Sequence, residues 1–240
     1  MPATRWPLLL AVRMACTHAP PPHGPTGQQD VLTTADGTRL WFRKLGTGTP
    51  VVVIPGAFML EPDFDVLAQG QTVVLYDPRN RARSSAVRDE QISIQNDVAD
   101  LEAIRAHLGA ERIIPVGWSY FGLMVALYAE AHPDRVERLV QIGPVAPVPG
   151  TKYEPPLSEP NSTLPPDVQE LYRQAEEAKA SAASTDPAGY CRTQQRFLRR
   201  LLVNNPARGD RFPDQCGWER EWPTNLDRHF QLMWRSIFQT

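Results

Sequence analysis

The sequence predicts an α/β domain, a parallel sheet flanked by helices, followed by a helical appendage. Short runs of apolar, β-branched residues alternate with segments of helical periodicity up to Pro144, and no such run occurs beyond Ile142. The chain has 240 residues, of which 42% are hydrophobic and 22% are charged. These values are typical of a globular protein and allow one domain with a small addition.

The predicted strands begin with a hairpin over residues 31–43, because Asp36-Gly37 is a typical two-residue turn between alternating apolar residues. Wholly apolar runs indicate strands that are covered on both faces. Four segments of this kind follow the hairpin: residues 50–54, 71–76, 112–117 and 136–142.

Two helices are predicted between these strands. Ser93 is a suitable N-cap, apolar residues then recur every three or four positions up to Leu108, and Gly109 stands at a usual stop position. Residues 119–131 are apolar all round, which predicts a helix buried against the sheet. Strands that alternate with helices imply a parallel sheet with helices on both faces.

The last third of the chain has a different character. Residues 145–166 are rich in proline and carry no periodicity, which predicts an extended linker. Three helices are predicted beyond it, over residues 167–184, 190–203 and 226–238.

Composition excludes several classes of function. A net charge of −2 gives no reason to expect nucleic acid or an anionic membrane as a partner. No apolar run approaches the roughly 18 residues that a membrane span needs. The three cysteines form no CxxC pair, so neither a zinc site nor a disulfide framework is predicted, and no cofactor motif is present.

The N-terminus leaves two alternatives open. An apolar run over residues 6–12 and then Cys16 precede a proline-rich stretch, an order that resembles a bacterial lipoprotein leader in which Cys16 is lipidated. Arg13 interrupts the apolar part, which argues for a cytoplasmic protein with an unstructured N-terminus. A disulfide between Cys191 and Cys216 is expected only if the protein is exported.

The main candidate for chemistry is Ser119, in Gly117-Trp-Ser-Tyr-Phe-Gly122. The segment lies where a predicted strand meets a predicted helix, so the hydroxyl would project above the carboxyl edge of the sheet. Backbone N–H groups at the start of that helix could stabilise an oxyanion. The spacing is G-x-S-x-x-G, because Phe121 stands where a small residue is expected. By itself the segment fits a nucleophile and a helix-capping serine equally well.

Four ordered blocks resemble the α/β-hydrolase superfamily, within it the proline-iminopeptidase-like branch. The resemblance covers roughly half of the chain, residues 31–147. The blocks are an apolar strand with its following loop, an Asp-x-Arg segment, a helix that leads into the Ser119 segment, and a His-Pro followed by a strand: residues 51–58, 77–84, 97–122 and 132–144.

The resemblance implies a hydrolase that cleaves an ester, an amide or a short peptide through an acyl-enzyme on Ser119. It implies an oxyanion hole formed by the backbone N–H groups of Ala57 and Tyr120, without a cofactor or a metal. Relatives that dehalogenate or open epoxides use an Asp nucleophile at this turn, so Ser119 implies acyl transfer.

The sequence departs from the family pattern near the implied hole. Pro55 replaces the usual His before the first loop, which removes a support of that loop. Asn80 and Ala82 replace two glycines, which the turn tolerates if it needs only a left-handed Asn.

The Asp-x-Arg segment is interpreted as structural. Asp77 follows the second parallel strand, and we expect it to pair with Arg79 or Arg81 and to fix the turn rather than to serve as the triad acid. The arginine-rich stretch 79–88 is interpreted as a solvated loop.

The resemblance also implies a domain organisation. We expect a disordered or leader segment (1–30), an α/β-hydrolase core (31–147), and a proline-rich linker with a helical lid (148–240). Relatives continue after the lid with two strands that carry the triad acid and His, and these last two strands are expected to be missing here. Of five histidines, only His229 in the lid could be brought to Ser119, and its sequence context does not predict a base.

Three interpretations of function follow. The first is a serine hydrolase that is weak or inactive because its base and acid are not identified. The second is a non-catalytic, hydrolase-like protein that binds a ligand or a partner. The third is a C-terminally shortened product of a longer gene. The tryptophans of the lid, Trp218, Trp222 and Trp234, are expected to serve packing. The sequence makes no prediction of the oligomeric state.

Overall fold

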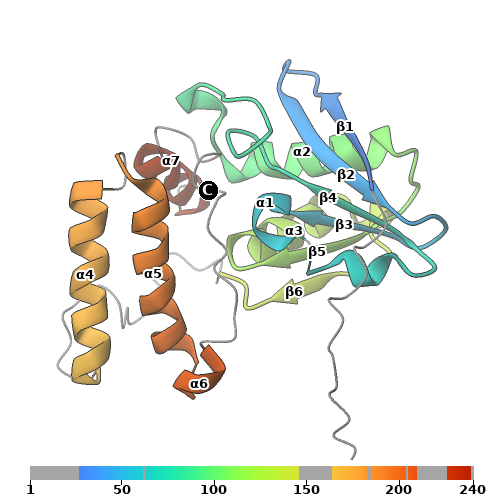
Figure 1. The fold of residues 1–240 in the computed structure, drawn as a ribbon. Helices are drawn as coiled ribbons and strands as arrows, with labels where there is room; N and C mark the ends of the chain where they lie inside the picture. The colour runs from blue at the N-terminus through green and yellow to red at the C-terminus, as the bar shows by residue number, and fades with distance from the viewer. Residues whose placement is uncertain are drawn as a thin grey trace, which may run out of the picture.

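A computed structural model describes residues 27–61, 63–145, 164–182, 185–203, 205–209 and 226–238. Its centre is a six-stranded sheet with the order β1-β2-β4-β3-β5-β6 (Figure 1). The predicted leader lies almost wholly outside the described residues, as do Cys16, Cys216, Trp218 and Trp222.

The first two strands form the predicted antiparallel hairpin. β1 (Gln28–Thr33) pairs with β2 (Arg39–Leu45), and Gly37 in the turn has a φ of 84°, which glycine adopts without strain. β2 then pairs antiparallel with β4, so the hairpin extends one side of the sheet.

The other four strands are parallel, as predicted. β3 (Val51–Pro55) lies between β4 (Thr72–Tyr76) and β5 (Ile114–Trp118), and β6 (Val140–Ile142) follows β5 at the edge. All residues of β4 are buried, which is why its sequence is apolar without alternation. The side chains of β6 are exposed.

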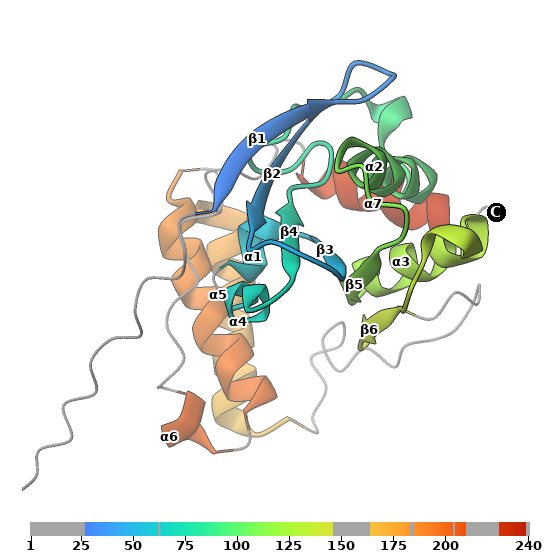
Figure 2. The same ribbon diagram turned by 90° about the vertical axis from the view of Figure 1, so that its right-hand side faces the viewer.

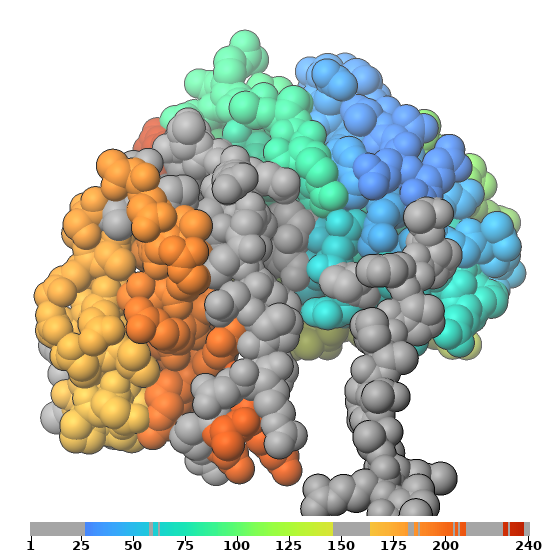
Figure 3. Space-filling view, viewed as in Figure 1, coloured from blue at the N-terminus to red at the C-terminus, as the bar shows by residue number. Residues whose placement is uncertain are grey.

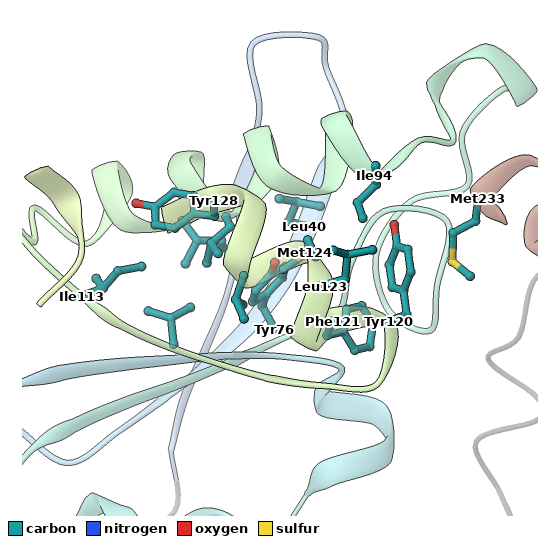
Figure 4. Packing of buried hydrophobic residues seen from close by; sticks show 14 of the residues in the cluster. Leu40, Tyr76, Ile94, Ile113, Tyr120, Phe121, Leu123, Met124, Tyr128 and Met233 are labelled. Atoms are coloured by element: carbon teal, nitrogen blue, oxygen red, sulfur yellow. The ribbon is translucent and has the colours of Figure 1, made fainter. Parts of the chain in front are cut away.

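Three helices cover one face of the sheet. α2 (Ile94–His107) begins at the predicted cap, where the Ser93 side chain accepts a hydrogen bond from the Asn96 N–H. α3 (Tyr120–Ala131) packs against β5, β6 and α2. α7 (Leu226–Phe238) adds Met233 to the same core (Figure 4), together with Ile237.

The opposite face is covered by shorter helices. α1 (Ala57–Leu60) and a 3₁₀ turn (Asp65–Ala68) follow β3. Leu60 and Leu67 from this segment pack against a second core, which the inner strands form on this face of the sheet. Helices therefore lie on both faces, as predicted, and α2, α3 and α7 share one of them. Other 3₁₀ turns occupy Asp89–Gln91 and Pro133–Arg135.

The C-terminal third contains the predicted helices. α4 (Pro166–Ala182) and α5 (Pro187–Leu202) form a hairpin with its own small core around Val168, Ala175 and Phe197, and α6 (Pro206–Gly209) follows. This hairpin stands beside the sheet (Figure 3), whereas α7 returns to lie against α2 (Figure 2). None of the helices that the structure describes is long and apolar enough to cross a bilayer.

Tyr76 places a hydroxyl in the main core without a hydrogen-bond partner in the described part of the chain. An unpaired buried hydroxyl is unfavourable, so Tyr76→Phe should leave the free energy of unfolding unchanged or raise it by up to about 1 kcal/mol. Tyr128→Phe is the matched control, because the Tyr128 hydroxyl donates to Glu102 over 2.8 Å. That variant should lose about 1 kcal/mol in urea unfolding. A larger loss in Tyr76→Phe would contradict the unpaired hydroxyl.

Cys191 in α5 forms a disulfide. Its partner among the chain's three cysteines is Cys16 or Cys216, and we expect Cys216. A non-reducing peptide map should contain a Cys191–Cys216 cross-link, and Cys216→Ser should lower the free energy of unfolding by about 3 kcal/mol, whereas Cys16→Ser should not. A cross-link to Cys16 would contradict this pairing.

Candidate active site

Ser119 lies on a strained turn between β5 and α3. Its backbone has a φ of 52° and a ψ of −118°, outside the regions that side chains other than glycine favour, at a cost of about 1–3 kcal/mol. The turn is fixed from β6: the Ser119 N–H donates to the Ile142 carbonyl over 3.0 Å, and the Val145 N–H donates to the Ser119 carbonyl over 3.1 Å. The predicted position of Ser119 at a strand-to-helix turn is therefore correct.

The small residues around this turn are required by close contacts. A Cβ on Gly117 would lie 2.1 Å from the Phe121 carbonyl oxygen, and one on Gly122 would lie 2.9 Å from Cβ of Pro144. Phe121 occupies the position where a small residue was expected, and its ring lies against Gly56, where an added Cβ would come within 3.0 Å of it. The late glycine and the bulky Phe121 are thus both accommodated by neighbouring segments.

The two residues expected to donate to an oxyanion each begin a helix. Ala57, fully buried, is the first residue of α1, and Tyr120 is the first residue of α3. The N–H groups of a first helical turn have no acceptor within their own helix. The two helices follow neighbouring strands, β3 and β5.

The loop before Ala57 is supported without the usual histidine. Gly56 has a φ of 89°, and its N–H donates to the Tyr76 carbonyl over 2.8 Å. This bond ties the end of β3 to the end of β4, so Pro55 does not leave the loop unsupported.

The Ser119 hydroxyl has no hydrogen-bond partner among the described residues, and no described imidazole pairs with it. The His107 ring packs edge-on against Phe42 at 5.4 Å, and the His132 ring lies 5.0 Å from that of Tyr128. His18 and His23 lie outside the described residues.

His229 is bound elsewhere, in the core. Nε and Nη2 of Arg81 lie 3.1 and 2.7 Å from its Nε2, and the side-chain amide of Asn80 lies 3.0 Å from its Nδ1. Burial, together with the charge of Arg81, lowers the pKa of His229 to about 3. Near neutral pH this imidazole is therefore uncharged and is a poor acceptor for a serine proton.

The segment after β4 differs from two expectations. The ion-pair partner of Asp77 is Arg83, with Nε 2.6 Å from the carboxylate, rather than Arg79 or Arg81. Arg79 and Arg81 are buried, so the first half of this stretch is not a solvated loop.

Backbone geometry in the same segment also departs from expectation. Asn80 has a φ of 60° and Ala82 a φ of 47°, so both positions where the resemblance implies glycine adopt the left-handed region. Asn adopts this region readily, whereas Ala does so at a cost of about 1–2 kcal/mol.

The arginines of this segment are paired with acidic residues of α2 that the sequence analysis missed. Arg79 makes a two-pronged contact with Asp100, at 2.8 and 2.6 Å, and Nη2 of Arg81 lies 3.9 Å from Asp97. Asp97 and Asp100 share the face of α2 that buries Leu101 and Ile104. Two acidic residues on the apolar face of a helix were the signal for buried cations.

A cavity of about 420 Å³ lies at the opposite edge of the sheet from Ser119. It is lined near the starts of β3 and β4, among others by Lys44, Val51, Thr72 and Arg112. Its position separates it from the carboxyl edge of the strands, so it is not part of the candidate active site.

Comparison with known proteins relates this geometry to a family. A family model described as the alpha/beta hydrolase fold matches residues 49–236, well over half of the chain. A non-heme haloperoxidase from Rhodococcus erythropolis is 32% identical over 123 residues, which are 49% of this chain and 44% of that protein. A probable proline iminopeptidase from Streptomyces coelicolor is 33% identical over 127 residues, 47% of this chain and 39% of that protein. The chain thus matches less than half the length of these relatives.

Solved structures show the same fold. The epoxide hydrolase CorEH superimposes with a TM-score of 0.58 at 17% identity, covering 88% of this chain and 73% of that one. Epoxide hydrolase A from Mycobacterium thermoresistibile superimposes with a TM-score of 0.51 at 24% identity, covering 88% of this chain and 71% of that one. At these identities the likeness concerns the fold alone.

The buried His229 predicts a pH dependence of stability. Above pH 6.5 the imidazole is neutral in both the folded and the unfolded chain. As the pH falls from 6.5 towards 3, the unfolded chain takes up a proton that the folded chain does not, so the free energy of unfolding should decrease by up to about 1.4 kcal/mol per pH unit. Chemical unfolding of the wild type and of His229→Gln across this range measures the difference in slope.

Equal slopes in the wild type and in His229→Gln would contradict the placement of His229 beside Arg81.

Proposed function

Because the chain belongs to the alpha/beta hydrolase fold family, we propose that it is a serine hydrolase that transfers the acyl group of a small ester, an amide or a short peptide to Ser119. The observation that carries the proposal is the strained backbone of Ser119 at the carboxyl end of β5. Strain of this kind persists where the surrounding structure over-determines it and is typical of functional turns.

The proposed reaction has two halves. Oγ of Ser119 attacks the substrate carbonyl carbon while the N–H groups of Ala57 and Tyr120 stabilise the oxyanion. Collapse of this intermediate breaks the bond to the leaving alcohol or amine, which departs with the proton lost by the serine. Water then attacks the acyl-enzyme and releases the acid together with free Ser119.

The nucleophile favours acyl transfer over epoxide opening. Epoxide hydrolases are among the structures that share the fold, but their likeness carries no chemistry at the identities found. Members of this family that open epoxides attack with a carboxylate at the turn between strand and helix, and this chain has Ser119 at that turn. The iminopeptidase relative makes a proline arylamide a suitable first amide substrate.

A second candidate function is binding without turnover. It is favoured by the placement of His229, whose Nε2 accepts from Arg81 and whose pKa is lowered to about 3. A serine hydroxyl needs an adjacent base to attack near neutral pH. Under this candidate the site binds a carbonyl compound at the Ala57 and Tyr120 N–H groups and releases it unchanged.

Labelling tests the nucleophile without requiring turnover. A fluorophosphonate probe should label the folded protein, and Ser119→Ala should abolish the labelling, because the probe forms a covalent bond with Oγ. Ser85→Ala is a matched control in a serine whose hydroxyl binds the Arg39 N–H. Equal labelling of Ser119→Ala and the wild type would refute Ser119 as the nucleophile.

Turnover separates the two candidate functions. Hydrolysis of p-nitrophenyl acetate or of a proline arylamide should be slower than about 1 s⁻¹, the low end for ordinary enzymes, and should be lost in Ser119→Ala. His229→Ala should not lower the rate directly, because His229 is not placed as the base. Faster turnover that both variants abolish would contradict this account of His229.

A further inference from the structure

The hydroxyl of Tyr120 is anchored to a buried carboxylate. It donates to Oδ2 of Asp97 over 2.6 Å, and both side chains are buried. Tyr120 is the residue that follows Ser119, so this bond ties the first residue of α3 to the first turn of α2. Its short length is typical of a hydrogen bond to an ionised acceptor.

Arg81, in the segment after β4, contacts both Tyr120 and Asp97. Its guanidinium carbon lies 5.4 Å from the centre of the Tyr120 ring and 5.1 Å from that of Phe121, and Nη2 lies 3.9 Å from Asp97. The pKa of Asp97 is raised, because burial outweighs the charge of Arg81 and the Tyr120 hydrogen bond, which both lower it. The Asp97 carboxylate, the Tyr120 phenol and the Arg81 guanidinium therefore form one buried network, in which the loss of one group weakens the contacts of the other two.

Phe121 extends this cluster to the other side of the candidate site. Its ring lies edge-on to that of Tyr120 at 5.4 Å (Figure 4). It also packs against Gly56, the residue before Ala57. The cluster of Asp97, Arg81, Tyr120 and Phe121 thus lies in contact with the chain at both implied oxyanion donors. A shift of Tyr120 would be transmitted through Phe121 to the loop that carries Ala57.

We propose that Asp97 and Arg81 are positioning residues, which act through the side chains of Tyr120 and Phe121 to hold the N–H groups of Tyr120 and Ala57 in one fixed arrangement. This inference rests on the proposed function, because it assigns those N–H groups to an oxyanion. It explains why two aromatic residues follow the nucleophile where the family pattern has a small residue at the second position. A misplacement of about 1 Å at such a site costs on the order of 100-fold in rate.

The chain offers a matched control for this cluster. Tyr128 makes the same kind of bond between the same two helices, from its hydroxyl to Glu102 over 2.8 Å, two turns further along α3. Tyr120 and Tyr128 lie at opposite ends of that helix (Figure 4). Removing either hydroxyl weakens the contact between α2 and α3, but only Tyr120 adjoins Ser119.

The test measures the rate of fluorophosphonate labelling as a function of probe concentration, which separates probe binding from the bond-forming step. Tyr120→Phe and Asp97→Ala should lower the limiting rate about 10-fold to 100-fold without changing the half-saturating concentration. Tyr128→Phe should stay within about 3-fold of the wild type, whatever stability it loses. Asp97→Asn should recover most of the rate, because its amide oxygen can accept from the Tyr120 hydroxyl.

A limiting rate in Tyr120→Phe equal to that in Tyr128→Phe overturns the inference, provided that thermal unfolding shows both to be folded. If Tyr120→Phe does not fold, the comparison of Asp97→Ala with Asp97→Asn decides in the same way. Equal rates in those two variants also overturn it.

A second measurement does not depend on reactivity. Backbone ¹⁵N order parameters at Ala57 and Tyr120 should fall from rigid values near about 0.85 in Tyr120→Phe but not in Tyr128→Phe. A wild type that the probe does not label would refute the proposed nucleophile, and the order parameters would still decide the positioning. Unchanged order parameters at both amides in Tyr120→Phe would overturn it.

Discussion

The structure depends on how two buried guanidinium groups after β4 are paired. Arg79 binds Asp100 in two-pronged fashion, while Arg81 lies between Asp97, Tyr120 and His229. An unpaired charge in the core costs several kcal/mol, so these arginines constrain every element that contacts them. They join the β4 loop to α2, to the start of α3 and, over a separation of 148 residues, to α7.

At the candidate active site, Arg81 contacts Tyr120, the residue next to the strained backbone of Ser119. Ser119 keeps an unfavourable φ because its backbone is hydrogen-bonded to Ile142 and Val145. The next residue, Tyr120, is held by its hydrogen bond to Asp97. Gly56, Gly117 and Gly122 allow the surrounding segments to approach closely enough to do so. The same network keeps His229 away from acid–base chemistry, because its Nε2 accepts from a cation.

Much of the fold could be predicted because it follows from local patterns. Wholly apolar runs gave the inner strands, the Asp36-Gly37 turn gave the hairpin, and the Ser93 cap gave the start of α2. The partners of Asp77 and Arg81 could not be predicted, because a charged side chain in a sequence carries no sign of which opposite charge will face it. Ala82 was also missed: its left-handed backbone follows from the turn, not from its own preference.

The sequence by itself determined the order of strands and helices along the chain, the parallel sheet and the position of Ser119 at the carboxyl edge of that sheet. Periodicity and the handedness of strand–helix–strand connections suffice for these features. Only the tertiary structure decided that Phe121 packs on Gly56, that Asp97 anchors Tyr120 and that His229 lies beside Arg81. These contacts join residues 23 to 148 positions apart, or depend on the space that a distant glycine leaves, and no local pattern encodes such pairings.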